Sequence, residues 1–281
     1  ERNQASGNFG VSVATAGDVN GDGYADVIVG ANLFDNDQID EGTAFVYLGS
    51  AAGLSASPVW TADGNFVNSG FGVAVATAGD VNGDGYADII VGANVHGYEG
   101  RAFVYLGAAA GLATSPAWTG ESDQASANLA YSVATAGDVN GDGYADVIVG
   151  ARLYDNGQTD EGRAFVYLGS TVGLETSPGW TAESDQATAQ FGASVASAGD
   201  INGDGYADVI VGGPMYDNGQ TDEGRAFVYL GSAAGLSTNP AWTAESDQAS
   251  GSFGISVATA GDVNGDGYAD VILGAHLYNN G

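Results

Sequence analysis

The chain has 281 residues, and its 35 acidic residues against 5 basic ones give a formal net charge of −30. Such a negative surface repels phosphates and anionic lipids, so nucleic-acid binding is not expected. No run of about 18 apolar residues is present, so we expect no membrane insertion. Hydrophobic residues make up 44% of the chain and gather in short runs, which disordered acidic chains lack. There is no Cys, so disulfides are excluded.

One unit of roughly 60 residues recurs along the chain. Each copy carries the string Gly-Asp-Val/Ile-Asn-Gly-Asp-Gly-Tyr-Ala-Asp, and the loop begins at Asp18, Asp80, Asp138, Asp200 and Asp262. We treat residues 1–281 as a single array with units at approximately 1–62, 63–120, 121–182, 183–244 and 245–281, the last of them partial. The second unit is shortened around His96, which marks that segment as a loop.

Four short runs rich in Val, Ile, Phe and Tyr follow one another in each unit. The first two are represented by 9–14 and 25–30, and the third by 163–169. The fourth surrounds a single Trp, namely Trp60, Trp118, Trp180 or Trp242. Four short strands per unit are typical of propeller blades. A parallel β-solenoid is the competing architecture, but its repeats are far shorter. The sequence therefore predicts an all-β fold, a β-propeller of four-stranded antiparallel blades.

The last unit stops at Gly281, after its second strand. We therefore expect four full units plus a two-strand fifth, with 18 strands in total. Two arrangements of the ends are open. They close onto each other in an imperfect five-blade ring, or the incomplete last blade pairs end to end with a neighbouring molecule. The ring is favoured, because propellers use about four to eight blades.

The Asp-rich loop has the composition of a calcium site. From Asp18 to Asp26, oxygen side chains fall at loop positions one, three, five and nine. Position seven, Tyr24, offers its carbonyl, and Gly23 permits a sharp turn. Hard oxygen ligands without His or Cys select Ca²⁺. An EF-hand has Glu at position twelve, where this loop has Val29, so Asp26 closes the site instead. Metal-free Asn-Gly turns are the alternative, but such a turn does not need three carboxylates.

We therefore predict about five Ca²⁺ per chain, one in each loop between the first and second strands of a blade. The predicted ligands are Asp18, Asn20, Asp22, Tyr24 and Asp26; Asp80, Asn82, Asp84, Tyr86 and Asp88; Asp138, Asn140, Asp142, Tyr144 and Asp146; Asp200, Asn202, Asp204, Tyr206 and Asp208; and Asp262, Asn264, Asp266, Tyr268 and Asp270. No nucleophile with a base and no phosphate-cradling loop is found, so we do not expect an enzyme.

The combination of Phe-Gly, this loop and Gly-Ala after a strand resembles the FG-GAP repeat, which builds the propeller of integrin α subunits and of many bacterial surface proteins. The matching pairs are Phe9-Gly10 with Gly30-Ala31, Phe71-Gly72 with Gly92-Ala93, and Phe253-Gly254 with Gly274-Ala275. Two units depart from the pattern, at Leu129-Ala130 and at Gly212-Gly213-Pro214. The resemblance implies that the calcium loops join the first two strands of each blade. It also implies that ligands bind on the opposite face.

Two further polar segments, 154–163 and 183–186, recur on that opposite face. They are either an acidic ring of binding loops or locally paired turns. We favour the second interpretation, because charged runs are usually solvated loops. The Trp residues are either sugar-stacking platforms or core between blades, and one Trp per repeat favours core.

These observations predict a non-catalytic, calcium-binding module for protein interaction or adhesion. Calcium loops of this kind suit the calcium level outside cells, so we expect an extracellular or cell-surface location. The expected partner is a protein or glycan ligand at the face opposite the calcium loops. Two alternatives stay open, a carbohydrate-binding lectin propeller and an accessory propeller of a larger secreted enzyme.

Overall fold

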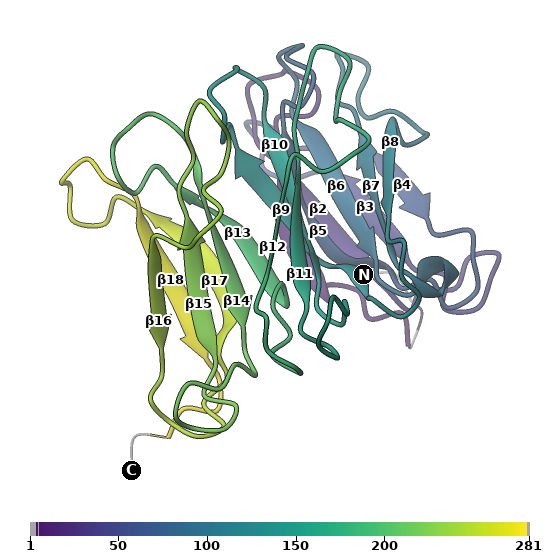
Figure 1. Cartoon of the computed structure of the whole chain (residues 1–281). Coiled ribbons are helices and arrows are strands. Elements are labelled where there is room, and N and C mark those ends of the chain that lie inside the picture. The colour runs from purple at the N-terminus through teal and green to yellow at the C-terminus, as the bar shows by residue number, and fades with distance from the viewer. Residues whose placement is uncertain (1–3, 5, 280–281) are drawn as a thin grey trace.

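A computed structural model describes residue 4 and residues 6–279 of the chain. Within these residues there are eighteen strands and a single 3-10 turn at His96–Tyr98 (Figure 1). The predicted all-β fold and the predicted strand number are therefore confirmed. The described residues contain no helix that is long and apolar enough to cross a membrane.

The strands form four complete blades and a fifth pair. The first blade has β1 (Ser12–Gly17), β2 (Asp26–Ala31), β3 (Thr43–Tyr47) and β4 (Trp60–Asp63). The second has β5 (Phe71–Gly79), β6 (Asp88–Ala93), β7 (Arg101–Tyr105) and β8 (Trp118–Glu121). The third has β9 (Leu129–Gly137), β10 (Asp146–Ala151), β11 (Arg163–Tyr167) and β12 (Trp180–Glu183). The fourth has β13 (Ser194–Gly199), β14 (Asp208–Gly213), β15 (Arg225–Tyr229) and β16 (Trp242–Glu245), and β17 (Phe253–Gly261) pairs with β18 (Asp270–Ala275).

Each complete blade is an antiparallel meander in which strands pair in chain order. In the first blade, Val13 lies opposite Val29, and Val29 lies opposite Phe45. The metal-loop segment joins the first and second strands, so all these loops project from one end of the blades. The connections from the second to the third strand and from blade to blade project from the other end.

The core lies between the blades. The first strands β1, β5, β9, β13 and β17 contact one another in succession. Trp60 shows how neighbouring blades meet, because its ring lies edge-on to Tyr105 with 4.9 Å between centroids, and its Nε1 donates to the carbonyl of Ala113 at 2.9 Å. Trp118 and Trp180 make the same contacts with the next blade. These three Trp side chains are therefore core, as favoured from the sequence, whereas Trp242 is 43% exposed because the pair β17 and β18 has no third strand to cover it.

The Phe-Gly and Gly-Ala signatures have a common physical cause. A Cβ at Gly30 would lie 1.9 Å from the carbonyl oxygen of Gly72, in the next blade. Gly72 itself has a φ of 84°, which side-chain-bearing residues disfavour. The second strand of one blade therefore touches the Phe-Gly turn of the next through backbone alone. In the third unit Ala130 takes the place of this second glycine and keeps a φ of 61°.

The two ends of the array stay apart. Val13 on β1 is 60% exposed, whereas its equivalent Val75 on β5 is 5% exposed. At the other end Ile272 on β18 is exposed, whereas its equivalent Ile210 on β14 is fully buried. Figure 1 likewise shows the first and last blades at opposite ends of an arc. The favoured five-blade ring is therefore wrong for this chain, because no blade covers these two faces. End-to-end association stays a prediction.

Candidate metal loops

Each loop is folded round its first Asp. Asp18 accepts the amide of Gly21 on Oδ1 at 2.7 Å and the amide of Gly23 on Oδ2 at 2.8 Å. Asp22 then accepts the amide of Tyr24 at 3.0 Å. The φ of 88° at Gly23 makes the predicted sharp turn. These bonds hold the side chains of positions one and five against a tightly curved main chain.

The same geometry recurs in all five loops. The first Asp accepts the amides of the fourth and sixth residues at 2.6–2.9 Å, and the acceptors are Asp18, Asp80, Asp138, Asp200 and Asp262. In the last loop the amide of Gly267 holds the pKa of Asp262 below its usual value, and other loop amides add to that effect. The first position of each loop is therefore built to carry a negative charge.

The last Asp of the loop is buried and points inward. Asp26 is fully buried, and it accepts the amide of Val19 at 2.9 Å and the amide of Gly49 at 2.8 Å. Gly49 follows β3, so this carboxylate ties the metal loop to the body of the blade. Asp88, Asp146 and Asp208 are equally buried and make the same pair of bonds.

Negative charges lie close together in these loops. Burial, together with the charges of Asp84 and Asp80, raises the pKa of Asp88 to about 6 against the effect of two backbone hydrogen bonds. Burial likewise raises the pKa of Asp146 to about 6, with further contributions from Asp138 and Asp142. A divalent cation would relieve this repulsion.

The structure places the five predicted ligands of each site in one short loop, but it does not draw them into a closed shell. Among the described residues, no three His, Cys, Asp or Glu side chains converge closely enough to hold a metal ion. The donor set nevertheless fits Ca²⁺, because each loop offers three carboxylates and one amide oxygen and no soft ligand. Carboxylate oxygens that accept one amide keep further lone pairs for a cation.

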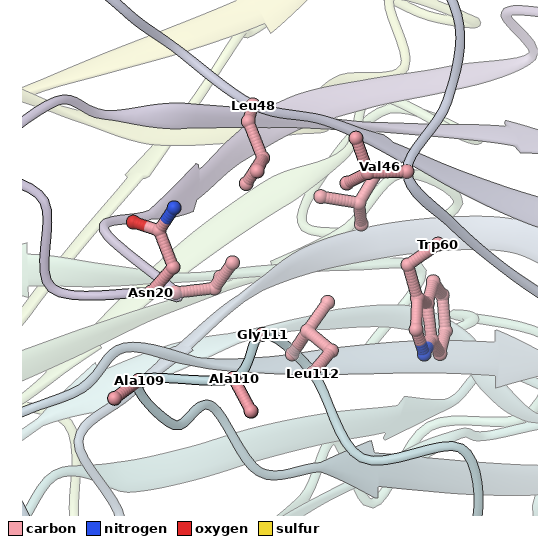
Figure 2. A pocket seen from close by; sticks show the side chains of 10 residues that line it. Asn20, Val46, Leu48, Trp60, Ala109, Ala110, Gly111 and Leu112 are labelled. Atoms are coloured by element: carbon pink, nitrogen blue, oxygen red, sulfur yellow. The ribbon is translucent and has the colours of Figure 1, made fainter.

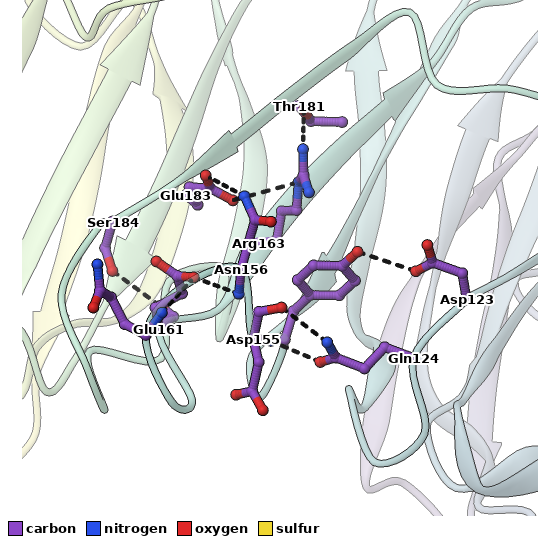
Figure 3. A network of polar contacts seen from close by, with 11 residues as sticks. Asp123, Gln124, Asp155, Asn156, Glu161, Arg163, Thr181, Glu183 and Ser184 are labelled. Atoms are coloured by element: carbon purple, nitrogen blue, oxygen red, sulfur yellow. Dashed lines mark hydrogen bonds and ion pairs between the residues drawn. The ribbon is translucent and has the colours of Figure 1, made fainter.

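The opposite face carries a second polar network, which Figure 3 shows for the third blade. Gln124, in the connection from the second blade, donates to the carbonyl of Asp155 at 2.8 Å and accepts its amide at 2.7 Å. Asn156 donates to both oxygens of Glu183, and Arg163 lies 3.7 Å from that carboxylate. These segments are therefore locally paired, as favoured from the sequence.

The residue that organises this face is Glu161, which the sequence places among locally paired residues without indicating that it is buried. Glu161 is fully buried, and its Oε1 accepts the amides of Asn156 and Gln158. Glu41 and Glu223 are buried in the same way in the first and fourth blades, and their Oε1 atoms also accept loop amides. The recurrence of Glu-Gly before the third strand was the available signal, but Glu is usually an exposed residue.

Small pockets lie between blades on the metal-loop side. One, of about 210 Å³, is lined by Asn20, Leu48, Trp60 and the turn of residues 109–112 (Figure 2). A matching pocket of about 230 Å³ lies between the third and fourth blades. Trp60 is only 8% exposed and its Nε1 is already bonded, so its ring offers little surface for stacking a sugar.

Comparison with known proteins identifies the repeat. The FG-GAP repeat profile matches residues 9–48, 71–105, 129–167, 191–229 and 253–281, which is well over half of the chain. The chain belongs to the FG-GAP repeat family. All five matched segments begin at the Phe-Gly position or its equivalent, and each of them contains one of the Asp-rich loops.

The curated relatives include integrin α subunits. Mouse integrin alpha-IIb is 36% identical over 162 residues, which cover 55% of this chain and 15% of the relative. Integrin alpha-5 of Xenopus laevis is 29% identical over 75% of this chain and 20% of the relative. Chicken integrin alpha-8 is 31% identical over 76% of this chain and 20% of the relative. The chain thus spans a fifth or less of the length of these relatives.

Proposed function

We propose that this FG-GAP array is a calcium-binding module that acts outside the cell in protein interaction or adhesion, without catalysis of its own. The similarity to integrin α subunits over much of the chain carries the adhesion part of the proposal. The net charge of −30 supports it, because it favours cations and basic partner surfaces over nucleic acid and membranes.

Five loops with the same donor set carry the calcium part. The ligands in each loop are three Asp, one Asn and one backbone carbonyl, as in the set from Asp18 to Asp26. In the second loop, for example, backbone amides hold Asp80 and the body of the blade holds Asp88, and these two carboxylates and Asp84 repel one another. Ca²⁺ would bind this oxygen set, neutralise the repulsion and fix the loop.

The partner contact is proposed for the opposite face. The metal loops are nearly identical from unit to unit, whereas on the opposite face the second unit has a shorter and different loop around His96 than the segment 154–163, which recurs at 216–225. Variation among loops on a rigid scaffold is where recognition usually resides. A protein ligand is preferred to a glycan, because three of the four Trp side chains are buried between blades.

Metal analysis tests the calcium part. After dialysis into millimolar Ca²⁺, the chain is expected to hold close to five ions, and Asp142→Ala close to four. A content of one ion or none would contradict the proposal.

A loop exchange tests the partner face. Residues 151–162 are replaced by the equivalent shorter segment 93–100 of the second unit, and binding to a panel of extracellular matrix proteins is measured in Ca²⁺. Reduced binding with an unchanged calcium content is expected. Binding that depends on glycans of the matrix proteins, and that the exchange leaves intact, would favour the lectin alternative.

A further inference from the structure

Consecutive metal loops touch one another through the tyrosine at position seven. A Cβ at Gly21 would lie 2.7 Å from Cε1 of Tyr86, which belongs to the next loop. The Tyr86 ring therefore rests directly on the backbone of the first loop. The same contact joins Gly83 to Tyr144, Gly141 to Tyr206, and Gly203 to Tyr268.

Two backbone hydrogen bonds reinforce this contact. The amide of Ala87, beside the buried Asp88, donates to the carbonyl of Asp18 at 3.0 Å. The amide of Ala108 donates to the carbonyl of Val19 at 3.1 Å, and the neighbouring amide of Gly107 holds Asp88 at 2.8 Å. The first ligand of one loop is thus bonded to residues next to the last ligand of the following loop.

The pattern repeats along the array and ends at both termini of the described chain. Ala145, Ala207 and Ala269 donate in the same way to Asp80, Asp138 and Asp200 at 2.9–3.0 Å. At one end, Gly265 of the fifth loop has no atom within 4 Å of the position of a Cβ. At the other end, Tyr24 belongs to the first loop of this chain and has no earlier loop in it to lie on.

We infer that the position-seven tyrosine is a positioning residue for the calcium site of the preceding loop, and that the five sites are therefore coupled in a line, each to its neighbours. This inference rests on the proposed calcium binding. An ion that orders one loop fixes the glycine backbone and the Asp carbonyl on which the next loop packs. The next ion then has less disorder to remove, so its binding is favoured. Coupling between sites typically amounts to a factor of about 5–150, and we expect the lower end.

Calcium titration of the full chain against a chromophoric chelator tests the inference. In Tyr144→Ala the backbone carbonyl of loop three remains, but the ring no longer covers Gly83. All five ions are expected to bind at saturation, with affinity for the neighbouring ions lowered about fivefold and a shallower binding curve. Tyr144→Phe should behave as the wild type, because the contacts are made by ring carbons. Tyr24→Ala, whose ring covers no earlier loop in this chain, is the matched control.

A double variant separates coupling from simple loss of packing. Asp84→Ala disables loop two, so adding Tyr144→Ala should then leave the remaining four affinities unchanged. A fivefold loss in that background, or equal losses in Tyr144→Ala and Tyr24→Ala, would overturn the inference. Five ions that bind the wild type with independent affinities would also overturn it while the proposed function stands. A wild-type chain that binds no calcium would refute the proposed function itself.

Discussion

On both faces of this array, carboxylates hold the loops by accepting their backbone amides, but different residues do so on each face. On the metal-loop face every unit repeats the same nine-residue loop, apart from Ile201 in place of Val, and its first residue accepts the same two amides, from Asp18 in the first loop to Asp262 in the last. On the opposite face the third blade has a long loop held by the buried Glu161, whereas the second blade has a short 3-10 turn at His96–Tyr98.

The difference shows which constraints are strict. A loop that gathers carboxylates and also touches the next loop tolerates little change in either role. A loop of the opposite face also bonds to the next blade, as the carbonyl of Glu161 does to the amide of Phe191, but the short loop of the second blade keeps the equivalent bond from Leu129 to Glu99. Loops on both faces therefore help to stack the blades, but the opposite face tolerates a change in loop length.

Removal of calcium should have the largest effect on stability, because it would empty all five metal loops at once. A site at one hundred times its dissociation constant adds about 2.7 kcal/mol if only the folded chain binds. We expect the melting temperature in chelator to fall by more than 15 °C relative to millimolar Ca²⁺, an order-of-magnitude figure for several sites together. Calorimetry measures it, with Mg²⁺ as the control ion. An unchanged melting temperature would contradict the metal assignment.

Asp146→Ala should be the most damaging single change within the metal loops. The side chain is fully buried and accepts the amides of Val139 and Gly169, so its loss leaves two buried donors without partners. Each such donor costs about 1–3 kcal/mol, so the free energy of unfolding should fall by about 2–6 kcal/mol even in chelator.

Asp142→Ala is the matched control for that change. Asp142 is exposed, so this variant should lose one ion but change stability in chelator by less than about 1 kcal/mol. Urea unfolding of both variants in chelator gives the comparison. Equal destabilisation would mean that the buried Asp has no structural role beyond the metal.

Glu161→Ala tests how much a buried carboxylate on the opposite face contributes to stability. The variant leaves the amides of Asn156 and Gln158 without their acceptor, and we expect a loss of about 1–3 kcal/mol with the calcium content unchanged. Hydrogen exchange should show faster exchange across residues 155–162, while the exposed control Thr159→Ala should not. A fall in bound calcium would show that the two faces are not independent.

The repeat structure was predictable from the sequence, because each signal is local. Strand runs, the Trp strand and the Asp-rich loop recur with fixed spacing, and the structure confirms the four-stranded blades. Some strands end a few residues earlier than the sequence predicts. The strand predicted over 163–169 ends at Tyr167 as β11, because the chain then turns to bring the amide of Gly169 to Asp146.

What the sequence could not supply depends on contacts between units. The ring closure favoured from the blade count fails because no blade covers Val13 or Ile272. The sequence places Glu161 in a locally paired turn, but it does not indicate that the side chain is buried, because burial of a carboxylate depends on amides that only the folded loop presents. The contact of Tyr86 with Gly21 joins residues of different units, so no motif within one unit reveals it.

Ala130→Gly should stabilise the chain modestly. Ala130 occupies the position of the Phe-Gly glycine with a φ of 61°, a region that costs a side-chain-bearing residue about 1–2 kcal/mol. Glycine relieves this strain but adds freedom to the unfolded chain, so we expect a net gain of about 0.5–1 kcal/mol in the free energy of unfolding. Gly192→Ala introduces the reverse strain in the next unit and should destabilise. A loss of stability in Ala130→Gly would mean that the packing of the Ala130 methyl group outweighs the strain of its backbone.

The smallest effect should come from His96, in the short loop of the second blade. Its ring lies 5.0 Å from that of Phe66 and 5.7 Å from that of Phe103, and burial, followed by the charge of Arg101, lowers its pKa. Glu99 and Glu121 act in the opposite direction but do not cancel this shift. The unfolded chain therefore binds a proton at His96 more readily than the folded chain. The contribution of His96 to stability is fully present above about pH 6.5 and is lost as the pH falls below that value.

His96→Phe keeps an aromatic ring and removes the titration. The difference in unfolding free energy between wild type and His96→Phe should shift in favour of the variant between pH 7.5 and pH 5.5, which urea unfolding at the two pH values measures. His276→Phe is the control, because this other histidine lies outside that cluster, and a shift of the same size there would refute the explanation.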